Sequence, residues 1–356
     1  MAESSGGIGN VTPNQRLVEM AMAYSRSRVL CAAARLGVAD GLADEVRSVG
    51  FLADECRADP RALYRLLRAL ASLGVTEETT PEHFRLTALG KPLRKDVPHS
   101  VWPAVVFWAD LLADEWSLLT DCVRSGLPAR DVRDPNVPSR WSQDPEAGSI
   151  FRAVMGTAPA EDYAPIAKAW DFSRAKLVAD LGGGGGSLIL AVLALNADVR
   201  GMLVDLEPSV DAAQSRFTKE DPSSRCKLIV CDLMKSVPAG ADVYMLKHVL
   251  HGRQDAEAIK ILENCHAVIP PDGSLLIIEF ILPPLVSHAD PHLEGRLMSD
   301  LNMLAVTGGK ERSEREWRAL LEAAGFTLTG VYPVGGDDFM VRNVGIVEAK
   351  PLLHSK

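Results

Sequence analysis

The sequence has no feature of a membrane-spanning or exported protein and no excess of basic residues. No uncharged apolar run approaches the roughly 20 residues that are needed to cross a bilayer. The N-terminal stretch MAESSGGIGN has neither the basic start nor the apolar centre of a signal peptide. With a formal net charge of −9, the chain also lacks the basic excess that is usual in nucleic-acid-binding proteins. We therefore expect a cytoplasmic protein whose partners include neither a membrane nor a nucleic acid.

The six cysteines form no recognisable framework. They are scattered, contain no C-x-x-C pair and have no histidine at a metal-ligand interval. Because a free cysteine behaves as a small apolar residue, we predict free, mostly buried thiols and no metal site.

The first hundred residues are predicted to be mainly helical. Leucines with the i, i+3, i+4 and i+7 spacing of one buried helix face lie between Pro60 and Val75, and Gly74 ends this helix. The next stretch, VTEETTPEHFRLTALG, alternates weakly around a turn-rich centre and is typical of a small hairpin. Two helices followed by such a wing indicate a winged-helix shape.

Winged-helix shapes often bind DNA, but the charges of this one argue against it. Residues 51–100 hold eight Lys/Arg and seven Asp/Glu, a net charge of +1. Arg61, Arg65 and Arg68 share one helix face, which we interpret as a solvated surface.

An earlier segment, RVLCAAARLGVADGLA, is predicted to be a single helix that is apolar on almost every side. A surface helix of that composition would leave apolar side chains in water. We therefore expect it to be buried in its own domain or against a second subunit, and we predict a homodimer.

Residues 101–170 continue as helices that are rich in Trp and Phe, interrupted by the loop RSGLPARDVRDPNVPSR. Any one of these aromatic side chains is more often an ordinary core residue. Together with three methionines they are typical of a pocket wall for a flat hydrophobic molecule. The residues of this presumed lid are Trp102, Phe107, Trp108, Phe151, Met155, Met298 and Met303.

The second half of the chain alternates short apolar runs with helical stretches. The runs are KLVADL, RGMLVD, KLIVCD, DVYMLKHVL and SLLIIEF. Strands that alternate with helices at this spacing predict an α/β fold with a parallel sheet buried on both faces. The last two runs, TLTGVYPV and MVRNVGIVEA, lie close together and predict a terminal hairpin.

A glycine-rich loop, Asp180-Leu-Gly182-Gly-Gly184-Gly-Gly186, follows the first strand of this half and precedes the helical stretch SLILAVLAL. Glycine lets the backbone approach a ligand closely at a helix N-terminus. The dinucleotide fingerprint needs glycines at i, i+2 and i+5, and this loop fails that spacing. The spacing here is D-x-G-x-G-x-G. It favours a cofactor in which an amino acid is attached to adenosine, rather than NAD.

Two acids follow at the next strand ends. Asp205 ends the second strand, where a carboxylate accepts hydrogen bonds from ribose hydroxyls, and Asp232 ends the third strand, where it accepts from an adenine amine. A lone glycine run is often only a tight turn. The loop and both acids at one sheet edge, where open α/β sheets bind ligands, indicate a cofactor site.

The fourth and fifth strands bring a base and acids to the same edge. The fourth ends in Lys247-His248 with His251 just beyond, and the fifth ends in Glu279. A phenol has a pKa near 10 and an imidazole near 6.5, so a histidine base needs a carboxylate that orients it and stabilises its cation. Glu279 is one candidate, and the other is Glu311, in the turn TGGKER that opens the next helix.

With these motifs the chain resembles the dimeric small-molecule O-methyltransferase family, which includes plant caffeate and flavonoid enzymes, acetylserotonin methyltransferase and bacterial polyketide or antibiotic O-methyltransferases. The resemblance covers nearly the whole chain. It is carried by RVLCAAARLGVADGLA, DLGGGGG, VDLEP, CDLMKSVP, LKHVLH, IIEFILP, DLNMLAVTGGKERSEREW and LLEAAGF.

The resemblance implies a Rossmann-like methyltransferase domain that binds S-adenosyl-L-methionine, preceded by a winged-helix-like dimerisation domain. We divide the chain into the dimerisation domain, a helical linker and substrate lid, and the catalytic domain, at residues 1–100, 101–170 and 171–356. The implied reaction is methylation of a hydroxyl on a small aromatic molecule, with His251 as the base and Glu279 and Glu311 as the flanking acids.

The implied cofactor contacts are Gly182, Gly183, Gly184, Asp205, Leu206, Asp232, Leu233 and Lys247. The resemblance places Asp300 and Asn302 opposite the substrate, and from the lid we add Trp108, Met155 and Met303.

The chain departs from the family pattern after its histidine. The family commonly reads His-Asp-Trp, whereas this chain reads His251-Gly252-Arg253. A guanidinium plane stacks on aromatic faces, which gives the hypothesis that Arg253 packs on the purine. Two other functions stay open: a pericyclic, hydroxylating or decarboxylating reaction on the same scaffold, and a cofactor-sensing regulator that binds DNA.

Overall fold

The computed structural model describes residues 12–134, 144–156, 159–221, 224–287, 290, 292–335 and 344–352. The chain forms two compact units, Met1–Ala113 and Asp114–Lys356. The finer division into residues 1–100, 101–170 and 171–356 stays a prediction. Within the described ranges, no helix combines the length and the apolar character that a membrane crossing requires.

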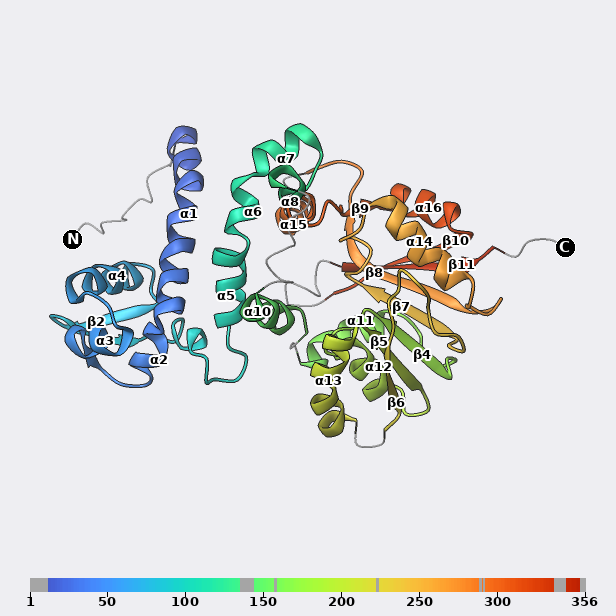
Figure 1. Ribbon diagram of the computed structural model, residues 1–356, viewed down its shortest axis with the longest axis horizontal. Coiled ribbons are helices and arrows are strands. Elements are labelled where there is room, and N and C mark those ends of the chain that lie inside the picture. Colours follow the sequence, from blue (N-terminus) through green and yellow to red (C-terminus); the bar gives the residue numbers. More distant parts are fainter. Residues whose placement is uncertain are drawn as a thin grey trace, which may run out of the picture. The chain divides into compact units, whose positions relative to one another are not determined.

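The first unit consists of helices and a small antiparallel sheet (Figure 1). The strand order of the sheet is β1-β3-β2. Helices α3 and α4 followed by the β2–β3 hairpin form the predicted winged-helix-like arrangement. The elements of this unit are α1 (Pro13–Leu36), α2 (Val38–Leu42), β1 (Arg47–Ser48), α3 (Val49–Cys56), α4 (Pro60–Ser72), β2 (Thr76–Thr80), β3 (His83–Leu86), the 3₁₀-helix η1 (Lys91–Leu93), α5 (Trp102–Val106) and the π-helix η2 (Phe107–Leu111).

The apolar segment 28–43 forms two helices, so the prediction of a single helix is wrong. Gly37 has a φ of 72°, a left-handed conformation that ends α1 at Leu36, and α2 begins at Val38. Glycine adopts this conformation without the steric cost that a Cβ brings. A run of apolar residues indicates burial, but it does not reveal a break of this kind.

Helix α4 has the predicted amphipathic character. Its buried side chains are Leu63, Leu67 and Leu70. The side chains on the opposite face, Arg61, Arg65 and Arg68, are exposed. The prediction that these arginines share an exposed helix face is therefore confirmed.

The second unit is a layered α/β structure (Figure 1). Its strands are β4 (Leu177–Leu181), β5 (Arg200–Asp205), β6 (Cys226–Val230), β7 (Val243–Lys247), β8 (Ser274–Leu282), β9 (Arg312–Ser313), β10 (Phe326–Pro333) and β11 (Val344–Pro351). Its helices are α6 (Ala113–Ser117), α7 (Leu119–Ser125), α8 (Ala129–Arg133), α10 (Pro145–Gly156), η3 (Ala160–Tyr163), α11 (Ala164–Ala169), α12 (Ser187–Leu195), α13 (Glu207–Glu220), α14 (Asp255–His266), α15 (Leu293–Val306) and α16 (Glu314–Ala323). Helix α8 lies in a segment that we predicted to be an irregular loop, and residues 135–140 of that loop lie outside the described residues.

The large sheet has the strand order β10-β11-β8-β7-β4-β5-β6, and the short β9 pairs with β8. Strands β4 to β8 run parallel to one another, whereas β10 and β11 are antiparallel. The predicted parallel sheet and terminal hairpin are both confirmed.

Both faces of this sheet are covered by helices (Figure 1). On one face, alternate strand residues such as Val178, Leu203 and Met245 pack against α11, α12 and α13. On the other face, their neighbours Ala179, Val204 and Leu246 pack against α14 and α16. Burial on both faces explains why the strands read as continuous apolar runs.

Two strand ends lie where the sequence predicts them. Strand β5 ends at Asp205 and β7 ends at Lys247. Because the strands are parallel, their carboxyl ends and the glycine loop after β4 share one edge of the sheet.

Three positions need correction. Strand β6 ends at Val230, two residues before Asp232, and Glu279 lies inside β8, which continues to Leu282. Glu311 does not lead directly into α16, because β9 intervenes.

The thiols have the predicted state. All six cysteines are free, and four of them are buried. The fold therefore depends on its apolar layers rather than on covalent links.

Candidate active site

The glycine loop leaves β4 at Leu181 and leads into α12. Gly182, Gly184 and Gly186 have positive φ values of 68°, 56° and 78°, a region that favours glycine. Gly186 is the N-cap of α12. The loop therefore presents bare backbone beside a helix N-terminus, where amide groups point outward.

The space around the loop differs from one glycine to the next. A Cβ added at Gly183 would lie 2.7 Å from Cγ of Asp180, whereas a Cβ added at Gly184 would meet nothing within 4 Å. Gly183 is thus packed against the sheet, and Gly184 faces open space. This surface without side chains fits a ligand that approaches the backbone closely.

Asp205 connects the glycine loop to the end of β5. Its Oδ2 accepts a hydrogen bond from the amide of Gly184 at 2.8 Å, and its Oδ1 accepts from the amide of Leu206 at 2.7 Å. Leu206 itself is exposed. Since each carboxylate oxygen has two lone pairs, Asp205 retains capacity to accept from the hydroxyls of a ribose.

Asp232 closes a short turn after β6. Its Oδ1 accepts from the amide of Met234 at 3.0 Å, and Nζ of Lys235 lies 3.3 Å from its Oδ2. These two donors hold the pKa of the Asp232 carboxyl below its ordinary value, so the group is an ionised acceptor. The adjacent Leu233 is half-buried, and its carbonyl accepts from the side chain of Asn264.

Lys247 and Asp180 lie on the neighbouring strands β7 and β4. Nζ of Lys247 lies 4.9 Å from the centroid of the Tyr163 ring. Burial raises the pKa of the Asp180 carboxyl to about 7, against the opposing charge of Lys247. We predicted no role for Asp180 from the sequence, although this acid begins the D-x-G-x-G-x-G pattern.

The imidazole of His251 lies in the loop after β7 and is held by carboxylates. Its Nδ1 lies 2.8 Å from Oε1 of Glu311 and 3.6 Å from Oε2 of Glu279. Because an ionised carboxylate only accepts hydrogen bonds, Nδ1 carries the hydrogen and Nε2 is the basic nitrogen. No described residue forms a hydrogen bond with Nε2 of His251, so this nitrogen is available to accept a proton.

The surroundings also set the basicity of this imidazole. Burial by itself would lower the pKa of His251, but the charges of Glu279 and Glu311 outweigh it and raise the pKa above 6.5. Burial raises the pKa of the Glu279 carboxyl, and the facing His251 opposes that shift. The arrangement therefore makes His251 a stronger base than a free imidazole.

Glu279 also holds the backbone that carries the base. Its Oε1 accepts from the amides of Val249, Leu250 and His251 at 3.1, 3.1 and 3.3 Å. The side chain has no exposed surface. Because its polar atoms are satisfied inside the protein, this acid can lie within β8 instead of ending it.

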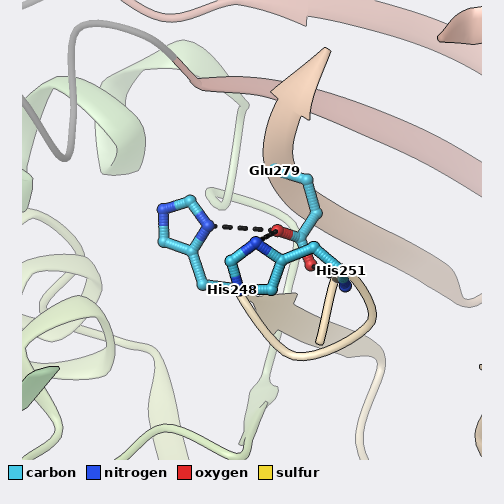
Figure 2. Close-up of side chains that lie close together, drawn as sticks. All are labelled: His248, His251 and Glu279. Carbon is cyan, nitrogen blue, oxygen red and sulfur yellow. Dashed lines mark hydrogen bonds and ion pairs between the residues drawn. The ribbon is translucent and has the colours of Figure 1, made fainter. Parts of the chain in front are cut away.

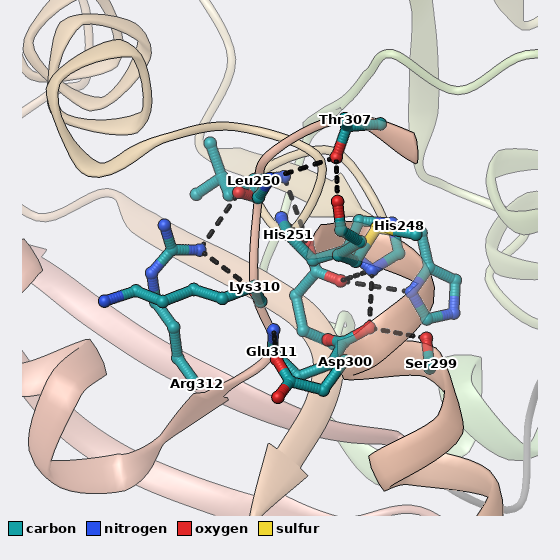
Figure 3. Close-up of polar contacts among 12 residues, drawn as sticks. His248, Leu250, His251, Ser299, Asp300, Thr307, Lys310, Glu311 and Arg312 are labelled. Carbon is teal, nitrogen blue, oxygen red and sulfur yellow. Dashed lines mark hydrogen bonds and ion pairs between the residues drawn. The ribbon is translucent and has the colours of Figure 1, made fainter. Parts of the chain in front are cut away.

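A second segment, residues 307–312, supports the same loop (Figure 3). The amide of Lys310 donates to the carbonyl of His251 at 2.9 Å, and the guanidinium of Arg312 donates to the carbonyl of Leu250 at 3.0 Å. A Cβ at Gly309 would overlap the carbonyl of His251. The glycines of TGGKER therefore allow two backbone segments to lie against each other.

Helix α15 contributes three polar side chains. The hydroxyl of Ser299 donates to Oε1 of Glu311 at 2.7 Å, and Oδ1 of Asp300 accepts from the amide of Glu311 at 2.9 Å. Oδ1 of Asn302 accepts from the indole of Trp116 at 3.0 Å. Asp300 and Asn302 thus hold other residues in place, and their predicted contact with a substrate stays a prediction.

The other predicted substrate residues differ in exposure. Met155 in α10 is 41% exposed, and Met303 in α15 is half-buried. Trp108, in the first unit, is 47% exposed. Their contact with a substrate also stays a prediction.

His248 is a member of the site to which the sequence analysis assigned no role. Its Nδ1 lies 3.0 Å from Oε2 of Glu279, and its ring stacks on that of His251 with a centroid distance of 5.0 Å and an interplanar angle of 28°. Figure 2 shows both rings beside the one carboxylate. The φ of His248 is 52°, a backbone conformation that the apolar pattern of β7 does not signal.

His248, His251 and Glu279 also resemble a set of metal ligands, because one donor atom of each lies within 4.8 Å of the others. Here the two imidazole nitrogens face carboxylate oxygens, and Oε1 of Glu279 accepts from three amides. A cation would have to displace these hydrogen bonds. We keep the prediction that the protein requires no metal.

The sheet edge thus combines two chemical capacities. Bare backbone flanked by two acids suits a ligand that carries adenosine and an amino acid. The imidazole, backed by two buried carboxylates, can accept a proton beside it.

Two family models match the chain. The model described as an O-methyltransferase dimerisation domain matches residues 18–96, and the model described as an O-methyltransferase domain matches residues 116–327. Among curated proteins, the O-demethylpuromycin-O-methyltransferase of Streptomyces alboniger is 36% identical over 342 residues, which are 95% of this chain and 89% of that protein.

Solved structures show the same likeness. The structure of LaPhzM has a TM-score of 0.87 and 32% identity, and the match covers 96% of this chain and 100% of that one. The O-methyltransferase NcsB1 from neocarzinostatin biosynthesis, in complex with S-adenosyl-L-homocysteine and 1,4-dihydroxy-2-naphthoic acid, has a TM-score of 0.76 and 31% identity, and the match covers 92% and 96%.

Proposed function

This chain belongs to the S-adenosylmethionine-dependent O-methyltransferase family, and we propose that its acceptor is a phenolic hydroxyl of a small aromatic natural product. His251 removes the proton of that hydroxyl, assisted by Glu279 and Glu311. The observation that supports this best is the imidazole of His251, which two buried carboxylates orient while Nε2 is left to accept a proton.

The residues at the sheet edge fit the cofactor. The open surface at Gly184 admits a ligand against the backbone, and Asp205 and Asp232 are acceptors suited to a ribose and an adenine amine. When bound, S-adenosylmethionine supplies an electrophilic methyl group on its sulfonium. The residues proposed to hold it are Gly182, Gly183, Gly184, Asp205, Leu206, Asp232, Leu233 and Lys247.

The imidazole of His251 has to deprotonate a phenol, whose pKa is higher than that of a free imidazole. A phenol and a free imidazole differ by roughly 3.5 pKa units, or about 5 kcal/mol at 1.36 kcal/mol per unit. The charges of Glu279 and Glu311 narrow this gap because they raise the pKa of His251. A base matched in this way typically contributes about 10²- to 10⁴-fold in rate.

The carboxylates act at each stage of the proton transfer. Before it, Glu311 fixes the tautomer in which Nε2 is unprotonated. After it, the imidazolium faces two carboxylates, which stabilise its charge. Glu279 adds a third effect, since its bonds to three amides fix the loop that carries His251. Precise placement of the base contributes to the rate because it removes the entropy cost of bringing the groups together.

An aromatic acceptor is supported by the relatives. NcsB1 was solved with a dihydroxynaphthoic acid, and the relative from Streptomyces alboniger is named for O-demethylpuromycin. We propose that a flat hydrophobic acceptor contacts the side chains Met155, Asp300, Asn302 and Met303 of the second unit.

We also propose that the protein is a homodimer. Its residues 18–96 match the dimerisation domain, and α1 exposes Leu17, Val18, Met20, Met22 and Tyr24. A second copy would remove this apolar surface from water. Sedimentation velocity at micromolar concentration tests this proposal, and a monomer would contradict it. A cytoplasmic location stays a prediction.

Product mass after incubation with S-adenosylmethionine and a panel of phenols tests the proposed reaction. We expect a product heavier by one methyl group and a rate that falls about 10²- to 10⁴-fold in His251→Ala, with binding of S-adenosylhomocysteine unchanged. Near-normal turnover of this variant would eliminate His251 as the base.

The same measurements separate the alternatives. A product without an added methyl would favour a pericyclic, hydroxylating or decarboxylating use of the scaffold. Salt-sensitive binding of DNA by the purified protein would favour a regulator.

A further inference from the structure

His248 occupies a backbone conformation that costs free energy. It directly follows β7, its amide donates to the carbonyl of Ile278 at 3.1 Å, and its φ is 52°. Residues other than glycine are uncommon at positive φ, with Asn, Asp and His enriched several-fold among them. Such strain persists where the surrounding structure compensates for it, and it gathers at functional sites.

The ring of His248 shares one carboxylate oxygen with the proposed base. Oε2 of Glu279 lies 3.0 Å from Nδ1 of His248 and 3.6 Å from Nδ1 of His251 (Figure 2). The other oxygen, Oε1, already accepts from three amides. Glu279 therefore has a single oxygen for both imidazoles, and His248 has the shorter contact.

This sharing has a consequence for Glu279. The carboxylate is fully buried, and a buried charge is stable only when donors or opposite charges face it. Because an ionised carboxylate accepts and never donates, Nδ1 of His248 is the donor in this contact. Without that donor, Oε2 would keep only the longer contact to His251.

We propose that His248 is a positioning residue of the methyl-transfer reaction: by donating to Oε2 it keeps Glu279 ionised and leaves Nδ1 of His251 to pair with Glu311. This inference rests on the proposed function, in which His251 is the base. It assigns His248 an effect on His251 that runs through Glu279.

Other charged groups face this cluster and must stay the same in any test. Glu311 lies 2.8 Å from His251, and the charge of Lys247 acts on both His251 and Glu279. Asp300 accepts from the amide of Glu311 on the far side. Phe280, whose ring centroid lies 5.0 Å from that of His248, packs against the ring without charge.

Two substitutions separate the donor from the ring. His248→Asn keeps an N–H at the position of Nδ1, does not titrate and tolerates positive φ. His248→Phe keeps an aromatic ring for the stacking but has no donor. If the donor matters, His248→Phe loses the effect and His248→Asn keeps it, whereas a role of the ring stacking would give the opposite result.

The measurement is the pH dependence of kcat/KM, which reports the ionisation of the free enzyme's base. In His248→Phe, Glu279 takes up a proton more readily, so His251 loses a neighbouring charge and its pKa falls. We expect the acidic limb of the kcat/KM profile to move to a pH about one unit lower, and the plateau value of kcat/KM to fall about tenfold. In His248→Asn the limb stays where it is in the wild type.

A double substitution tests whether the effect runs through Glu279. In Glu279→Gln the charge is already absent, so adding His248→Phe is expected to move the acidic limb no further. A further shift in the double variant, or identical profiles for His248→Phe and His248→Asn, would overturn the inference.

Control variants keep the outcomes apart. If His251→Ala retains near-normal turnover, His251 is not the base and the proposed mechanism fails, whereas an inactive His251→Ala combined with an unmoved limb in His248→Phe contradicts only the inference about His248. If His248→Phe does not bind S-adenosylhomocysteine in calorimetry, His248→Leu replaces it. A limb that stays at the wild-type pH in His248→Leu then counts against the inference.

Discussion

Nδ1 of His251 and Oε1 of Glu311 lie 2.8 Å apart, and the same carboxylate oxygen accepts from the hydroxyl of Ser299 at 2.7 Å. Glu311→Gln keeps the size of the side chain but removes its charge. We expect kcat to fall about 10- to 100-fold and the pKa of His251 to fall, because one of the charges that raise it is lost. Steady-state kinetics over a range of pH check both effects. Ser299→Ala leaves the charge in place and is the matched control, so an equal loss in both variants would contradict a role for the charge.

The pH profile of the wild type follows from the same contacts. Only the neutral imidazole accepts a proton, and the pKa of His251 lies above 6.5. Activity is therefore expected to fall as the pH decreases through that raised pKa, with a midpoint of kcat/KM above 6.5. A midpoint below this value would mean that burial outweighs the two carboxylates.

Much of this site could be predicted from the sequence because parallel strands align their ends. Once the apolar runs define the strands, the glycine loop, Asp205 and Lys247 must share one edge, and the structure confirms their places. The family, the enzyme class and the cofactor are confirmed as well. These properties depend on periodicity and on local motifs, which a single sequence displays directly.

Other features depend on contacts between distant residues and could not be predicted. Nothing in the run SLLIIEFIL shows that Glu279 stays inside the strand, because its three amide donors come from another loop. The stacking of His248 on His251 likewise requires a positive φ that no pattern specifies. The break at Gly37 belongs to the same class, since a glycine within an apolar run signals neither a turn nor a helix by itself.

Asp205 is proposed to bind the cofactor, so its substitution should weaken that binding. Its carboxylate accepts from Gly184 and holds the glycine loop against β5. We expect Asp205→Ala to weaken binding of S-adenosylhomocysteine about tenfold or more, which corresponds to about 1.4 kcal/mol. Isothermal titration calorimetry measures it. Asp211→Ala, at an exposed position of α13, is the control and should bind as the wild type does; a loss shared by both variants would point to a nonspecific effect of charge.

Gly183 and Gly184 differ in what a methyl group would meet. In Gly183→Ala the new Cβ would lie 2.7 Å from Cγ of the buried Asp180, so we expect a loss of about 1–3 kcal/mol in stability. In Gly184→Ala the Cβ has space, and the positive φ costs only about 1 kcal/mol. Denaturant unfolding compares the two variants.

The variants Gly183→Ala and Gly184→Ala also distinguish an effect on stability from an effect on cofactor binding. Because the methyl of Gly184→Ala would project into the open surface proposed for the cofactor, affinity for S-adenosylhomocysteine should fall more than stability does. Unchanged affinity in Gly184→Ala would place the cofactor elsewhere.

Arg253 stands where the family commonly has a tryptophan, and its charge acts on Asp232, the acid that we propose accepts from the adenine amine. It is among the charges that lower the pKa of the Asp232 carboxyl. Its own contacts are weak, since the nearest carboxylate oxygen of Glu257 is 3.7 Å away and the side chain is 44% exposed. We expect Arg253→Ala to weaken binding of S-adenosylhomocysteine about tenfold, because a guanidinium plane that stacks on a purine would be lost.

Arg253→Lys distinguishes the two ways in which this residue can act. Lysine keeps the positive charge beside Asp232 but has no plane to stack. If stacking matters, the Lys variant should bind S-adenosylhomocysteine as weakly as the Ala variant. The ratio of its dissociation constant to that of the wild type, measured by calorimetry, should then be the same at two salt concentrations. If lysine restores the affinity at low salt and loses it at high salt, the charge is responsible, and wild-type affinity in Arg253→Ala would remove Arg253 from the cofactor site altogether.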